Sequence, residues 1–158
     1  SEEALLSMPE LQRPDQSVHL LNWPEFEESL VDSALDSKWE QLLAVREEVY
    51  RKLEEARQQT VLGTSLEAGV RIYAGGQVLE LLREMAAQLP AVFIVSQVEV
   101  DDLSTYGGER ANSGDIEVVV EKALGGKCPR CWNYHETVEE AAGGVCPRCE
   151  EALKEIGR

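Results

Sequence analysis

All four cysteines of this 158-residue chain lie in its last 31 residues, as two identical Cys-Pro-Arg-Cys pairs. Cys128 and Cys131 form the first pair, Cys146 and Cys149 the second, and fourteen residues separate the pairs. A gap of two residues lets both thiolates of a pair reach one ion, and zinc prefers four such ligands in a tetrahedron. The spacing therefore predicts one structural Zn²⁺. Because four thiolates fill every position, no site remains for a reactive water, and the zinc would be architectural.

Two other uses of the cysteines are weaker. Disulfides need an oxidising compartment, and the start of the chain, Ser-Glu-Glu, lacks the basic and apolar regions of a secretory signal. A thioredoxin-like redox site needs one motif at a helix start and no second copy. His135 is a possible replacement ligand, but the four thiolates already complete the set. A tail this short buries little apolar surface, so the metal would supply most of its folding free energy.

Cationic and aromatic side chains surround the two cysteine pairs. The cations could offset the negative charge of the thiolates, or the set could bind single-stranded nucleic acid by stacking and phosphate contacts. The spacing supports both interpretations equally. The residues concerned are Lys127, Arg130, Trp132, Tyr134, His135 and Arg148.

The net charge limits where an anion can bind. Fifteen Lys and Arg against thirty Asp and Glu give −15, and such a surface repels a phosphate backbone. The imbalance is uneven, since residues 1–124 carry −14 and residues 125–158 only −1. A general nucleic-acid binder is excluded, and any contact with an anion is expected in the tail.

The segments before the tail predict an α+β fold: a long helix or helices, then a small sheet with one packed helix, then a four-cysteine zinc-knuckle or ribbon tail. Residues 1–24 form a leader, with one helical turn at 5–8 and an apolar run at 17–23 that we expect to be buried. Residues 25–63 are helical, because apolar side chains three or four apart make one stripe over 27–59, with Gly63 as a stop.

Residues 64–124 are expected to form a small α+β junction domain, and residues 125–158 the zinc-binding domain. The predicted order is a strand at 66–73, a helix at 78–89 ended by Pro90, and strands at 91–100 and 116–120. Asp101 and Asp102 are adjacent, so we interpret them as solvated loop carboxylates and no acid/base pair.

No apolar stretch approaches the roughly 20 residues of a membrane-spanning helix. The longest, 89–95, contains Pro90 and is typical of a buried strand. We therefore expect a cytoplasmic protein without membrane contact. The chain does not begin with Met, which favours a piece of a longer protein.

Several strings of this sequence resemble bacterial isoleucyl-tRNA synthetases in order along nearly the whole chain. KCPRCW at 127–132, CPRC at 146–149 and AL at 152–153 are similar to the C-terminal zinc finger of that family. The further matches are SVHL at 17–20, WP at 23–24, VREEV at 45–49, LEEAR at 53–57, Gly63, LEA at 66–68 and FIVS at 93–96.

The resemblance implies a C-terminal, tRNA-binding fragment of a class I, ATP-dependent isoleucine–tRNA ligase. Such a fragment adjoins the rest of the synthetase chain and assists recognition of the anticodon stem-loop, with the four cysteines as zinc ligands. Trp132 would face the anticodon loop, with Arg130 and Arg148 as weaker candidates. The HIGH-like and KMSKS-like signatures are absent, so this fragment carries no catalytic motif. No DNA partner is expected.

Two alternatives remain. A formamidopyrimidine-type DNA glycosylase has a similar zinc finger, but that class needs an N-terminal Pro-Glu and a basic groove, and this chain starts Ser-Glu-Glu. A zinc-ribbon adaptor would bind a protein partner through the stripe of the long helix, at Trp39, Leu42 and Leu43.

Overall fold

The structure is a computed structural model that describes residues 2–7, 17–20, 22–23, 25–109, 115–138 and 144–157. Contacts divide the chain into two compact units, Ser1–Ser33 and Ala34–Arg158. The first unit holds helix α1 (Glu2–Ser7) and two short 3₁₀ turns, Val18–Leu20 and Glu28–Leu30. The helical turn expected at 5–8 overlaps α1, and its last residue lies outside the described ones.

The expectation that residues 17–23 are buried is wrong for the large side chains described there. Leu20 is 70% exposed and Trp23 is 93% exposed. Leu20 ends a single 3₁₀ turn, and Trp23 lies in irregular chain after it. Neither side chain belongs to the two buried clusters that the described residues form.

Helix α2 (Ser33–Gln58) begins later than the predicted helix at 27–59. Residues 28–30 form their own 3₁₀ turn, and Val31 after them is extended. Asp32 directly precedes α2, and aspartate favours this flanking position over a helix interior.

The helix ends at a residue in the left-handed conformation. Thr60 has φ 59°, and the N–H of Val61 donates to the carbonyl of Ala56 at 3.0 Å. This is the bond pattern of a Schellman motif, which satisfies the last carbonyls. The stop is therefore Thr60 and not the predicted Gly63.

Only the C-terminal part of the apolar stripe of α2 faces the core. The buried residues are Leu42, Val45, Val49, Leu53 and Ala56. Apolar side chains of the predicted stripe that are exposed are Leu30, Val31, Leu35, Trp39 and Leu43. The prediction that the whole stripe contacts the core is therefore wrong. The first half of the stripe is exposed apolar surface.

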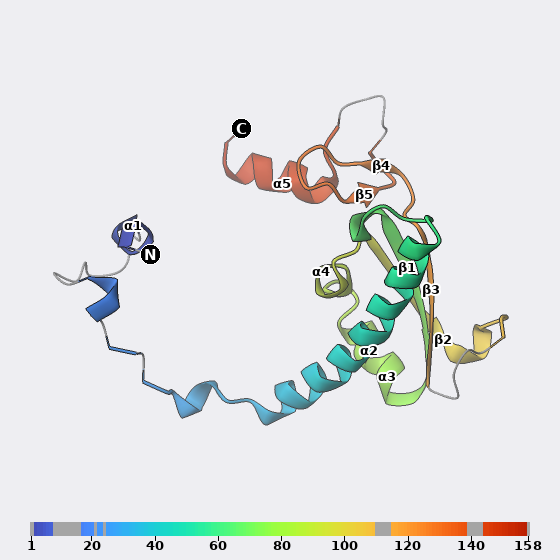
Figure 1. Cartoon of the computed structure of the whole chain (residues 1–158), viewed down its shortest axis with the longest axis horizontal. Coiled ribbons are helices and arrows are strands. Elements are labelled where there is room, and N and C mark those ends of the chain that lie inside the picture. Colours follow the sequence, from blue (N-terminus) through green and yellow to red (C-terminus); the bar gives the residue numbers. More distant parts are fainter. Residues whose placement is uncertain are drawn as a thin grey trace. The chain divides into compact units, whose positions relative to one another are not determined.

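A three-stranded sheet follows α2. Strand β1 (Ala68–Ala74) lies in the centre, parallel to β2 (Gln97–Asp102) and antiparallel to β3 (Ile116–Lys122). Helices α2, α3 (Gly76–Glu84) and α4 (Leu89–Phe93) lie on the same side of this sheet (Figure 1). The α+β architecture predicted from the sequence is confirmed, with three helices where one was expected to pack.

The run at 89–95 is not the predicted strand. Pro90 lies in the first turn of α4, where a missing N–H costs nothing, and it does not end a helix. Ile94 then adopts φ 56° and turns the chain toward β2. The strand predicted at 91–100 therefore begins only at Gln97.

The carboxylates at the end of β2 have structural partners. Asp101 pairs with Tyr73 of β1 in the sheet register. Asp102 accepts a hydrogen bond from the backbone N–H of Ser104 at 2.8 Å and caps the 3₁₀ turn Leu103–Thr105. Their assignment to a loop is wrong, since both belong to β2.

The tail contains a two-stranded sheet, β4 (Gly126–Lys127) and β5 (Tyr134–His135), and helix α5 (Pro147–Glu155). Among the residues described, none of the helices is long and apolar enough to cross a bilayer.

Candidate metal centre

Each cysteine pair lies on a tight backbone turn. Cys128 follows β4, and its carbonyl accepts from the N–H of Trp132 at 2.9 Å, which closes the first turn around Cys131. Cys146 immediately precedes α5, and its carbonyl accepts from the N–H of Cys149 at 2.9 Å. These turns point both sulfurs of each pair in one direction.

The four sulfurs form one cluster. All four Sγ atoms lie within 4.8 Å of one another, and none is in a disulfide. The Sγ atoms of Cys131 and Cys146 are 3.7 Å apart. With Zn–S bonds of about 2.3 Å, the edge of a tetrahedron is about 3.8 Å. The distance between Cys131 and Cys146 matches this edge, and the four sulfurs lie close enough together to share one zinc ion.

Hydrogen bonds and burial shift the pKa values of the cysteine thiols in opposite directions. Burial alone would raise the pKa of Cys128, but the N–H groups of Cys131, Cys146 and Arg130 lower it to about 6. Burial and the neighbouring thiols raise the pKa of Cys131 to about 12, and burial also raises the pKa of Cys146. Four thiolates can coexist here only around a cation, which is the condition that a bound zinc ion meets.

The tail is fixed to the sheet by polar contacts that sequence reasoning missed. The hydroxyl of Ser96 accepts from the N–H of Tyr134 at 2.7 Å and donates to the carbonyl of Leu66 at 2.5 Å. The amide of Gln97 accepts from the N–H of Leu124 at 2.8 Å and donates to its carbonyl at 2.9 Å. A serine before a strand and a glutamine at its first position carry no signal in the sequence that would reveal these roles.

The predicted tail residues fall into separate groups. Trp132 is 61% exposed, and the ammonium of Lys127 lies 5.7 Å from the centre of its ring. Arg130 donates from Nη1 to the sulfur of Cys149 at 3.5 Å. This contact raises the pKa of Arg130 and supports the charge-balancing interpretation for this arginine.

The other candidates lie nearer the sheet. Nδ1 of His135 lies 2.9 Å from the hydroxyl of Thr137, and this histidine is outside the sulfur cluster. Tyr134, His135 and Arg148 line one hollow, which Trp132 does not line. The structure thus brings three of the six candidates together and leaves Trp132 with Lys127.

Known proteins resemble this chain both in the zinc-finger tail and over most of its length. Residues 125–152 match a family described as a zinc finger found in FPG and IleRS. The isoleucine–tRNA ligase of Desulforudis audaxviator is 42% identical over 139 residues, which cover 86% of this chain and 15% of that protein. The isoleucine–tRNA ligase of Syntrophotalea carbinolica is 49% identical over 121 residues, 75% of this chain and 13% of that protein.

The cysteine cluster and the matched segment define a zinc-finger protein whose four cysteines fit one structural Zn²⁺. More particularly, the chain is homologous to isoleucine–tRNA ligases and corresponds to their C-terminal, zinc-finger-bearing region. It spans about 15% of the length of these relatives. The predicted family, fold class and cofactor are confirmed.

Proposed function

We propose that this chain is a non-catalytic region of an isoleucine–tRNA ligase that helps to bind the anticodon stem-loop of tRNA in the cytoplasm. Cys128, Cys131, Cys146 and Cys149 would hold the zinc, whose role is to fold the tail. The other partner would be the remainder of the ligase chain. The homology over up to 86% of the chain favours this over a DNA glycosylase, whose resemblance rests on the zinc finger alone.

The observation that carries the proposal is the conformation of Trp132. Its φ of 68° lies in the left-handed region, which is costly for a bulky side chain and suits glycine. The ring is mostly exposed, so burial does not compensate for this cost. A strained, exposed aromatic residue next to a lysine is typical of a binding surface that stacks on a base.

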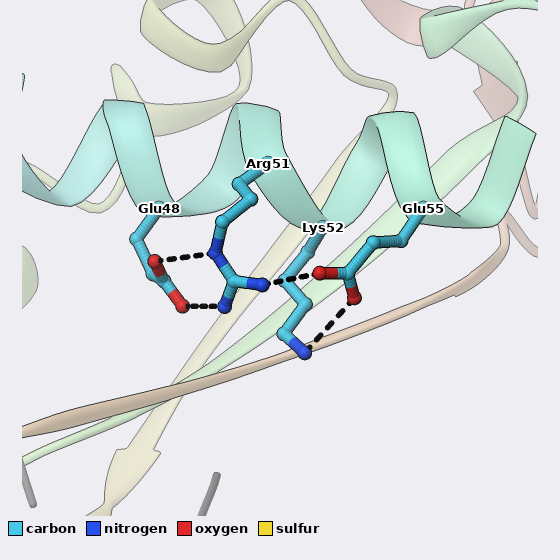
Figure 2. Close-up of polar contacts among 4 residues, drawn as sticks. All are labelled: Glu48, Arg51, Lys52 and Glu55. Atoms are coloured by element: carbon cyan, nitrogen blue, oxygen red, sulfur yellow. Dashed lines mark hydrogen bonds and ion pairs between the residues drawn. The ribbon is translucent and has the colours of Figure 1, made fainter. Parts of the chain in front are cut away.

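Several cations in the earlier part of the chain are held by carboxylates. Figure 2 shows Arg51 between Glu48 and Glu55 on α2, with Lys52 also bound to Glu55 at 3.1 Å. The hydrogen bond with Arg51 lowers the pKa of Glu48, so this carboxylate stays ionised at neutral pH. A carboxylate beside each of these cations opposes the approach of a phosphate, so these cations are poor phosphate contacts.

Lys127 and Arg148 make no ion pair with a carboxylate among the residues that the structure describes. The tail therefore offers cations to RNA although the whole chain carries −15. Because that total charge opposes phosphate binding, we assign the tail to specificity and the main tRNA affinity to the rest of the ligase.

Replacement of Trp132 tests the stacking role. In the parent ligase, Trp132→Ala is expected to weaken tRNA binding by about 1–3 kcal/mol, the usual contribution of one stacked base. Isoleucine activation should not change, because no catalytic motif lies in this chain. Binding of labelled tRNA and amino-acid activation are measured on the same preparation.

Trp132→Gly is the matched variant, because glycine accepts the left-handed conformation. We expect it to weaken tRNA binding equally and to change tail stability by no more than about 1 kcal/mol. Equal tRNA affinity for wild type and both variants would refute the stacking role.

The uncovered half of α2 favours a second function, contact with another protein surface. Trp39 and Leu43 line a hollow of about 500 Å³ with Arg46, Ala91 and Val92, and this hollow is mostly apolar. We expect the isolated chain to self-associate weakly through this surface, and Trp39→Asp to abolish the association without unfolding, because a charge there opposes burial. Sedimentation velocity measures it; a wild-type chain that is monomeric at all concentrations contradicts the second function.

A further inference from the structure

A hollow of about 490 Å³ lies where the zinc tail meets α4. Pro90 and Ile94 contribute its apolar side, and Asn133, Tyr134, His135 and Arg148 come from the tail. We call this hollow the α4 groove. The hydrogen bond of Tyr134 to Ser96 holds the tail residues against α4, so the groove is a fixed feature of the fold.

The lining of the α4 groove contains no acidic residue. This is notable in a chain with twice as many acidic as basic residues. Arg148 is exposed there and makes no ion pair or hydrogen bond within the described part of the chain. Cys146 also lines the groove, as one of the four thiolates whose charge a zinc ion would offset. An anion there would thus meet the guanidinium of Arg148 and no carboxylate, which favours a phosphate over an acidic peptide or a cation.

The rest of the lining suits a planar, partly apolar group. Tyr134 and His135 offer ring faces, and Pro90 and Ile94 offer an apolar surface. Ile94 is 53% exposed and has φ 56°, a strained conformation for a β-branched residue. This conformation ends α4, and the exposure of Ile94 leaves its apolar side chain available to a ligand in the groove.

We propose that the α4 groove binds one unpaired nucleotide of the RNA, with the base on the Tyr134 side and a phosphate on Arg148. The side-chain amide of Asn133 can hydrogen-bond to a base edge there. This inference rests on the proposed tRNA-binding function and adds a second contact, separate from Trp132, which does not line the groove.

The test measures binding of the zinc-loaded 158-residue chain to a fluorescein-labelled RNA hairpin with the anticodon stem-loop sequence of an isoleucine tRNA. Arg148→Gln is expected to weaken binding about five-fold or more. It should also reduce the slope of log K against log salt by about 0.7, the value for one phosphate contact to a single strand.

Lys154→Gln is the matched control. It removes the same charge from the same helix, but Lys154 is paired with Glu150 and does not line the groove. We expect it to change affinity less than about two-fold and to leave the salt slope unchanged.

A second variant avoids the neighbourhood of the cysteines. Ala87 is exposed in the turn before α4 and lines the groove but not the hollow at Trp39, so Ala87→Trp should fill the groove while zinc content stays at the wild-type value. We expect a loss of affinity similar to that of Arg148→Gln, with Ala87→Ser as the conservative control.

The outcomes distinguish the groove from the tail function. Wild-type affinity in Arg148→Gln and Ala87→Trp, together with a loss in Trp132→Gly, overturns the groove and leaves the proposed function intact. Absence of hairpin binding by the wild-type chain overturns the groove, whereas the proposed function is overturned by the Trp132 variants in the parent ligase, where the main tRNA affinity lies. If the groove variants change only self-association, a protein segment occupies the groove, and the nucleotide assignment is wrong.

Discussion

Removal of zinc is expected to unfold the tail and leave the rest of the second unit folded. Among the described residues, the buried cluster of the tail consists of Cys128, Val138, Cys146 and Cys149. Val138 is therefore the one buried side chain of this cluster that is not a cysteine. Metal binding contributes about 10–16 kcal/mol in comparable zinc-finger peptides. Without it, the apolar contacts cannot offset the conformational entropy of the tail.

Hydrogen exchange with mass spectrometry, before and after chelation, measures this effect. Amides of the tail, including those of Cys128, Trp132 and Cys149, should lose protection, because their hydrogen bonds close the two turns. Amides of β1 should keep theirs, because the main core lies between the sheet and its helices. Unchanged protection of the tail after complete removal of metal would contradict an architectural zinc.

The second large effect is expected from the core beside α4. Phe93 is fully buried and belongs to the cluster formed by the sheet and the helices. Phe93→Ala is expected to reduce the free energy of unfolding by about 3–5 kcal/mol, through lost burial and the remaining cavity. Denaturant unfolding followed by circular dichroism measures the change.

The adjacent residue supplies the control. Ile94 is exposed and strained, so Ile94→Gly loses little burial and removes the strain of the left-handed conformation. We expect a change of at most about 1 kcal/mol. Similar losses of stability in both variants would show that α4 is not packed as described.

The family and the zinc site could be predicted from the sequence because their signals are local. A two-residue gap between cysteines directly limits which sulfurs can share an ion. The chain has no cysteine outside the two pairs, so the choice of ligands is unambiguous. The third strand, β3 (Ile116–Lys122), was predicted for a similar reason, since its apolar run has clear ends. The zinc-ligand and tRNA-contact assignments remain predictions.

The region 89–100 shows why other parts could not be predicted. An apolar run of this length suits a buried strand as well as a buried helix, and Pro90 is compatible with a helix end or a helix start. Tertiary packing decides, because Leu89 and Phe93 reach the core together only from a helical turn.

The exposed half of α2 has a different cause. Periodicity shows that Trp39 and Leu43 share a face with core residues, but it does not say which partner covers that face. Since the chain spans about 15% of its relatives, we interpret the uncovered surface as a contact for other parts of such a ligase.

The most direct test of this account is the zinc content of the chain purified without added metal, together with thiol titration before and after denaturation. We predict about one zinc per chain and four thiols that react only after unfolding, as four buried or half-buried free cysteines around one ion require. A chain without metal, or without free thiols, would contradict the four-thiolate site and the tail that depends on it.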